Sequence, residues 1–123
     1  MNYQQFVDSI KSRIPVGVTL ANPGGGTSTI TSYSEEKIVY QRGNSKISVS
    51  FEDLYKAYSQ FKGKQVYTTD LRDFAPEIFD SKRNGHSCNS TFFFSILKLL
   101  GKVIEIKGDG KANHPFYVSI SEE

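Results

Sequence analysis

Hydrophobic residues recur at helical spacing after Gly85, and the rest of the chain is organised around this stretch. Small polar residues that can cap a helix precede the apolar run and Gly101 follows it, so we predict a helix from about Asn89 to Leu100. One side of this helix gathers the apolar residues that we expect in the core, namely Phe92, Phe93, Ile96, Leu99 and Leu100.

The opposite strip of the same helix is hydroxylated and basic, with one aromatic residue. It contains Thr91, Phe94, Ser95, Lys98 and Lys102. Such a strip suits a helix that lies on a phosphate-lined groove, and it also suits an ordinary solvated face. The order of the other elements and the distribution of charge along the chain distinguish these two interpretations.

The first fifty residues predict one helix followed by a small antiparallel β-meander. Apolar residues at intervals of three and four make 2–14 amphipathic, and Pro15 ends that pattern. Runs rich in β-branched and aromatic residues then predict strands at 16–20, 27–33, 37–41 and 46–51. Turn residues separate these runs, so we expect neighbouring strands to pair in chain order.

The remaining residues, 51–123, predict further helices and a terminal β-hairpin. In chain order these are a helix at 53–61, an extended segment at 66–68, a helix at 70–74, a basic loop at 80–85, the helix at 89–100, and a hairpin of 103–106 with 115–120. Ser50 is the expected cap of the first helix, and Pro76 breaks or restarts the second one. The tip of the hairpin, 107–111, is rich in glycine and lysine.

Composition favours one domain. A chain of 123 residues with 37% hydrophobic content is long enough for one substantial core and too short for two. No apolar run is long enough to cross a bilayer, and the first residues lack the pattern of a signal peptide, so we expect a cytoplasmic protein without a membrane partner. Cys88 is the only cysteine, which excludes an intramolecular disulfide and fits a reducing compartment.

Basic charge is concentrated in one segment. The formal net charge of +2 is too small by itself to indicate a polyanion as partner. Residues 81–111, however, carry six Lys or Arg against two Asp or Glu, an excess of four positive charges. This segment contains the predicted helix at 89–100 and the tip of the predicted hairpin.

From Glu52 onward, the order of helix, short extended segment, helix, loop, helix and β-hairpin resembles the winged helix-turn-helix family of DNA-binding domains. The resemblance covers a little over half of the chain, and the first fifty residues match no part of that family. It implies that 89–100 is a recognition helix in the major groove. It also implies that the hairpin at 103–120 is a wing that touches the neighbouring backbone or the minor groove.

The same resemblance implies a set of DNA-contacting residues. Those that would face DNA from the helix and its entry are Ser87, Asn89, Ser90, Thr91, Phe94, Ser95 and Lys98. The basic residues that would lie on phosphates are Lys82, Arg83, Lys107 and Lys111. Their coincidence with the basic segment is what favours DNA as the partner.

His86 and Cys88 are the candidates for catalytic chemistry. They stand two residues apart just before a helix, where the helix dipole and the imidazole can activate the thiol as a nucleophile. The sequence places no third group to orient the base, and a cysteine at such a position is more often a small buried residue. Together with His114, the pair offers fewer and more widely spaced ligands than zinc sites usually show.

We therefore predict an α+β single domain, in which the helix and β-meander of 1–50 pack on a winged-helix part at 51–123. The predicted function is non-enzymatic binding of double-stranded DNA in transcription regulation, without a cofactor or metal ion. One alternative is a protein-interaction module, or a homodimer, in which Phe94 joins Tyr67 or Tyr117 in an exposed patch. The other alternative is a small enzyme that uses His86 and Cys88.

Overall fold

The computed structural model describes all 123 residues, and they form a mixed α+β fold, as predicted. In chain order the elements are α1 (Tyr3–Arg13), β1 (Thr19–Ala21), β2 (Thr27–Tyr33), β3 (Lys37–Arg42), β4 (Ser45–Ser50), α2 (Phe51–Phe61), β5 (Gln65–Tyr67), α3 (Thr68–Phe74), α4 (Pro76–Phe79), the 3-10 helix η1 (Ser81–Arg83), α5 (Cys88–Leu99) and β6 (Tyr117–Ser119). No helix among them combines the length and the apolar character needed to span a bilayer.

Strands β1 to β4 form an antiparallel sheet in chain order, which confirms the predicted meander. Side chains alternate across this sheet, as in any sheet with one covered face. The covered face buries Ile30, Ile38, Tyr40, Ile47 and Val49.

Local capping residues set the helix starts. At α1, the Gln5 backbone N–H donates to Asn2 Oδ1 at 2.9 Å, and the Asn2 backbone N–H donates to Gln5 Oε1 at 2.8 Å. At α2, the Asp53 backbone N–H donates to Ser50 Oγ at 3.0 Å, as predicted. Pro76 opens α4 at its first position, which confirms the predicted restart.

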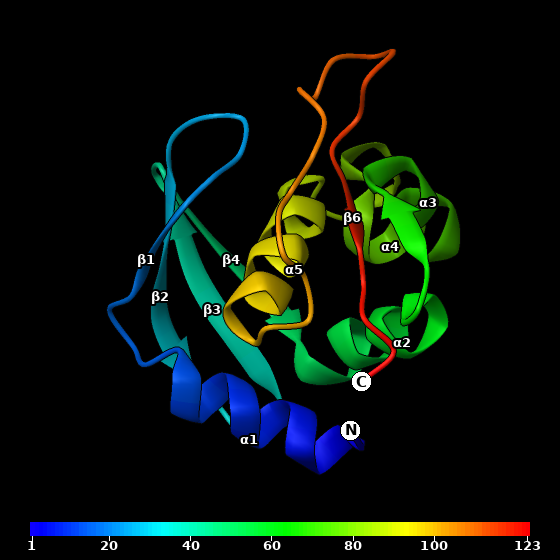
Figure 1. The fold of residues 1–123 in the computed structure, drawn as a ribbon. Coiled ribbons are helices and arrows are strands. Elements are labelled where there is room, and N and C mark those ends of the chain that lie inside the picture. The colour runs from blue at the N-terminus through cyan, green and yellow to red at the C-terminus, as the bar shows by residue number, and fades with distance from the viewer.

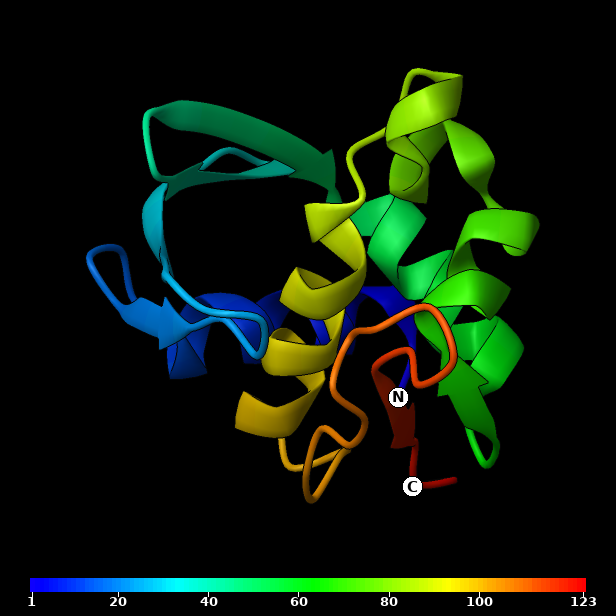
Figure 2. The ribbon, with the colours of Figure 1, turned by 90° about the horizontal axis from the view of Figure 1, so that it is seen from above.

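Helix α5 lies in the middle of the molecule, between the four-stranded sheet and the helices α2, α3 and α4 (Figure 1, and from above in Figure 2). Toward the sheet, the rings of Phe92 and Tyr40 stack with centroids 3.8 Å apart and planes 6° apart. Toward the helices, Phe93 lies against Phe79 of α4, with ring centroids 6.3 Å apart. Every side chain of α5 from Phe92 to Leu97 is therefore buried.

The predicted faces of α5 are wrong in part, because two layers cover this helix. Phe94 and Ser95, which were expected on a solvated strip, are 0% and 9% exposed. Leu99, which was expected in the core, is 44% exposed, whereas Phe92 and Ile96 are core as predicted. The prediction assumed a helix packed on a single layer, for which one apolar side is enough.

The predicted terminal hairpin does not form a regular ladder. β6 pairs with β5 instead, with Val118 opposite Val66, and 103–106 belongs to no strand. Two isolated bridges, of Lys107 with Tyr117 and of Lys111 with His114, join the two arms, and the Ser121 backbone N–H donates to the Lys102 carbonyl oxygen at 2.9 Å. All three residues of β5 pair with β6, whereas 103–106 is irregular and does not form a strand that could pair with it.

Residues 107–116 close as a loop, which we call the 107–116 loop. It reaches the top of the view in Figure 1, beyond the start of α5. Gly108 has a φ of 91°, and a Cβ atom at that position would lie 2.3 Å from the Pro115 carbonyl oxygen. The close approach of the two arms therefore requires glycine.

Candidate functional site

A cleft of about 490 Å³ opens at the start of α5. Its walls come from the end of β3, the start of α3, the segment that leads into α5, and the 107–116 loop. Three cationic side chains line it, Arg42, Arg72 and Lys111, and none of its fifteen lining residues is an aspartate or a glutamate. We call this hollow the basic cleft.

The three cations of the basic cleft are free of ion pairs. The ion pairs of the structure join Lys56 to Glu52, Arg83 to Asp80, and Lys107 to Glu105. Because none of these three cations forms an ion pair with a carboxylate, their charges add to a local positive potential. Anions are the class of ligand that this potential attracts.

Each cation is held by a different element. Arg42 is the last residue of β3 and is paired in the sheet with Ser45 of β4. Arg72 is half-buried on α3. In the 107–116 loop, the Lys111 backbone N–H donates to Asp109 Oδ1 at 2.9 Å, which fixes the turn that carries the lysine. Their convergence is therefore a property of the tertiary fold.

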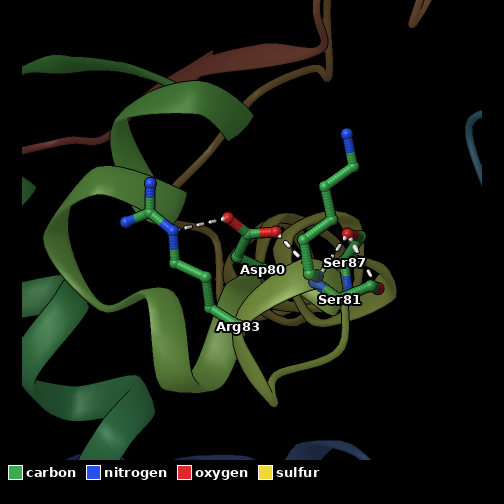
Figure 3. A network of polar contacts seen from close by, with 5 residues as sticks. Asp80, Ser81, Arg83 and Ser87 are labelled. Atoms are coloured by element: carbon green, nitrogen blue, oxygen red, sulfur yellow. Dashed lines mark hydrogen bonds and ion pairs between the residues drawn. The ribbon is translucent and has the colours of Figure 1, made fainter.

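Hydroxyl groups surround the cations. Six hydroxyl side chains line the basic cleft: Thr68, Thr69, Ser81, Ser87, Ser90 and Thr91. Ser81 and Ser87 bind each other, since each backbone N–H donates to the other's Oγ, at 3.2 Å and 2.9 Å, and the two Oγ atoms are 2.9 Å apart (Figure 3). Asp80 caps η1 beside them and pairs with Arg83 at 3.5 Å. This network fixes the entry into α5.

Ser90 differs from the other hydroxyl residues because it is only 2% exposed. Its Oγ is buried, has no hydrogen-bond partner in the protein, and belongs to a residue that lines the basic cleft. Leaving a buried hydroxyl unpaired costs about 1–3 kcal/mol. A ligand oxygen that reaches this atom would remove that cost.

The structure brings four of the predicted DNA-contacting residues together in the basic cleft: Ser87, Ser90, Thr91 and Lys111. Lys82 lies next to it, in a second hollow of about 430 Å³ that shares Thr69, Arg72, Ser81 and Ser87 with the cleft. Three other predicted basic residues lie elsewhere. Arg83 is paired with Asp80, Lys107 is paired with Glu105 at 3.6 Å, and Lys98 is exposed near the far end of α5.

Asn89 holds the layers together and is not available to read base edges, which corrects the prediction. Its Oδ1 accepts from the Tyr40 hydroxyl at 2.6 Å, and its Nδ2 donates to the Ile78 carbonyl oxygen at 2.9 Å. The side chain is 2% exposed, and both of its polar ends are in use. The entry of α5 into the core explains this role, because a polar residue buried there needs partners from both layers.

Phe94 and Ser95 likewise cannot face DNA, because their side chains are 0% and 9% exposed. Phe94 is also excluded from the exposed aromatic patch that the protein-interaction alternative requires. Tyr67 and Tyr117 stack on each other across the β5–β6 ladder, with ring centroids 4.8 Å apart. The alternative therefore loses the residue that was expected to extend this pair.

His86 and Cys88 both line the basic cleft, but nothing orients them toward each other. The Cys88 thiol lies 3.3 Å from the Tyr40 hydroxyl. Burial, and secondly the contact with Cys88, raise the pKa of Tyr40, so this hydroxyl stays neutral and cannot act as a base toward the thiol. No cluster of three or more His, Cys, Asp or Glu side chains is placed to hold a metal ion.

Sequence reasoning missed Arg42 and Arg72, which supply two of the three cations. Neither stands in a basic run, and the sequence assigns Arg42 only to a turn between two strands and Arg72 only to a short helix. No protein-family model, curated protein or solved structure matches this chain. The geometry and chemistry of the basic cleft are therefore the basis for assigning a function.

Proposed function

We propose that this chain is a non-enzymatic domain that binds double-stranded DNA through the basic cleft. The observation that carries the proposal is the convergence of three unpaired cations, from three separate elements, in a hollow without carboxylates. Phosphate contacts by Lys and Arg dominate the affinity of proteins for DNA, and neutral hydroxyls add hydrogen bonds to the phosphate oxygens.

The order of elements supports a winged-helix arrangement for 51–123. Helices α2, α3 and α5 follow the order that the resemblance requires, β5 is the short extended segment, and the 107–116 loop takes the place of the wing. In this proposal, α5 approaches DNA with its first turn, where Ser87 and Thr91 line the basic cleft. The rest of α5 supports the site from within the core.

The basic cleft continues into the hollow that contains Lys82, because the two share Thr69, Arg72, Ser81 and Ser87. A duplex backbone lying along this surface would meet Lys82, Arg72 and Lys111 in one tract. Asp73 and Asp80 also line the hollow, so the attraction is strongest at the cleft itself. Arg42 contributes from the opposite wall, on the sheet.

A salt series of binding to a labelled duplex of random sequence tests this proposal. Arg72→Ala and Lys111→Ala should each weaken binding to every sequence alike and flatten the slope of log affinity against log salt by about one unit. Lys62→Ala is the matched control, because this exposed lysine follows α2 and lines neither hollow. Undetectable binding at low salt, or an unaltered slope in the double variant, refutes the proposal.

A further inference from the structure

The basic cleft is built more deeply than contacts along a duplex backbone require. Ser90 lines it although its side chain is almost fully buried, and Ser90 Oγ has no partner in the protein. Buried hydroxyls normally have a hydrogen-bond partner, so an unpaired one at the wall of a cleft points to a ligand.

The charge of the basic cleft exceeds that of one internal phosphate. A phosphodiester within a strand carries one negative charge and is tied to a sugar on both sides. A phosphate monoester carries about two negative charges near neutral pH and has three free oxygens. Arg42, Arg72 and Lys111 bring three positive charges, and each arginine can contact two phosphate oxygens at once. The monoester is the better match.

The basic cleft also has room for more than a phosphate. Its volume of about 490 Å³ lies within the range of small-molecule sites, roughly 300–1,000 Å³. Phe116 lines it from the 107–116 loop, and a Cβ atom at Gly110 would lie 2.5 Å from the Phe116 ring, so the ring is closely packed against the loop backbone. A fixed aromatic ring can stack on a nucleotide base of any sequence.

We infer that the basic cleft binds the phosphate monoester at the end of a DNA strand, with the terminal nucleotide beside Phe116. Ser90 Oγ donates to one phosphate oxygen, and the cations of the cleft neutralise the charge. The inference rests on the proposed function, since it names the part of the DNA that enters the cleft. The recognised chemistry is a nucleotide phosphate monoester, which a free mononucleotide also carries.

Binding to one duplex prepared with different ends tests the inference. The duplex carries 5′-phosphates, 3′-phosphates or only hydroxyl groups, and free deoxyadenosine monophosphate is the fourth probe. We expect a phosphorylated duplex to bind at least about tenfold more tightly than the hydroxyl-ended one, the effect of a hydrogen bond to a charged group. Competition between the free nucleotide and the duplex shows whether base pairs beyond the terminal one contribute to the affinity.

Ser90→Ala is the decisive variant. It should reduce the preference for phosphorylated ends by about tenfold or more, the effect of one hydrogen bond to a charged group, and leave binding to the hydroxyl-ended duplex unchanged. The melting temperature of the free protein should not fall, because Ser90 Oγ has no partner in the protein. Ser95→Ala is the matched control, since Ser95 is a buried serine of the same helix that does not line the cleft, and it should keep the preference.

The outcomes separate the two proposals. Equal affinity for phosphorylated and hydroxyl-ended duplexes overturns this inference and leaves DNA binding in place. Binding of the free nucleotide without any binding of duplex refutes the proposed function and assigns the cleft to a free nucleotide. A preference for phosphorylated ends that is undiminished in Ser90→Ala overturns the role of Ser90.

Discussion

Removing the Tyr40 hydroxyl tests the central position of α5. This hydroxyl donates to Asn89 Oδ1 at 2.6 Å, and Asn89 Nδ2 donates in turn to the Ile78 carbonyl oxygen, so a single side chain of α5 ties the sheet to the helical layer. Tyr40→Phe keeps the ring, which is stacked on Phe92 with centroids 3.8 Å apart. The substitution therefore removes the hydrogen bond to Asn89 and the weaker contact with the Cys88 thiol at 3.3 Å, and it changes little of the packing.

The expected cost follows from the burial of both partners. Tyr40 is 0% exposed and Asn89 is 2% exposed, so water cannot replace the lost donor. Leaving Asn89 Oδ1 buried without a donor should lower the free energy of unfolding by about 1–3 kcal/mol. Asn89→Ala should cost at least as much, because it removes the acceptor of the Tyr40 hydroxyl and also one of the two hydrogen bonds to the Ile78 carbonyl oxygen, which keeps the bond from the His86 backbone N–H. In the double variant the two effects overlap, with a coupling energy of about 0.5–3 kcal/mol.

Urea unfolding followed by circular dichroism measures these free energies by linear extrapolation. Duplex binding by folded Asn89→Ala, measured alongside, should equal that of the unsubstituted protein. A Tyr40→Phe protein as stable as the unsubstituted one would refute the reasoning. So would an Asn89→Ala protein that keeps its stability and loses affinity for DNA, because that result would restore Asn89 as a base-reading residue.

Two further predictions concern packing and pH. Ile96→Ala should lower the free energy of unfolding by about 2–5 kcal/mol and Leu99→Ala by less than half as much, because Ile96 is 0% and Leu99 is 44% exposed. Equal losses in urea unfolding would contradict the burial of Ile96 in the core. Burial raises the pKa of Tyr33 from 10.0 to about 12, because the folded state disfavours the charged phenolate. The stabilisation from the neutral Tyr33 hydroxyl is therefore complete below pH 10 and is lost as the pH rises through 12. Tyr33→Phe should lessen this alkaline decline in melting temperature, and an identical decline in both proteins would argue against it.

The parts of the fold that were predictable are those with local signals. Capping residues such as Asn2 and Ser50 mark helix starts, and turn residues separate the strands of the meander, so these elements appear near their predicted bounds. The partner of β6 was not predictable in this way. Both β5 and 103–106 alternate in sequence, and only the packing of distant segments decides between them.

The two-sided burial of α5 did leave a signal in the sequence. Phe92, Phe93 and Phe94 are consecutive, so they point to different sides of a helix, and Leu97 adds to the apolar surface. A helix that is apolar on all sides is a buried one, and giving weight to that pattern would have removed Phe94 and Ser95 from the predicted site.

The candidate site was predictable only where it coincides with the entry of α5. Ser87, Ser90 and Thr91 belong to that entry and were predicted as contacts, although Ser90 is buried. Arg42 and Arg72 line the same cleft although they are about thirty residues apart in the chain. No sequence pattern indicates that these two segments lie close together. A cluster of this kind exists only after the layers have packed.

The position of α5 between two layers means that the spacing of the cations depends on the interior. Arg42 belongs to the sheet and Arg72 to the helical layer, and the side chains of α5 keep these layers apart. The separation of the end of β3 from α3 therefore depends on the thickness of a close-packed core, and not on the length of a loop. A smaller or larger side chain at Phe92 would change which anion can span both arginines without altering any residue on the surface.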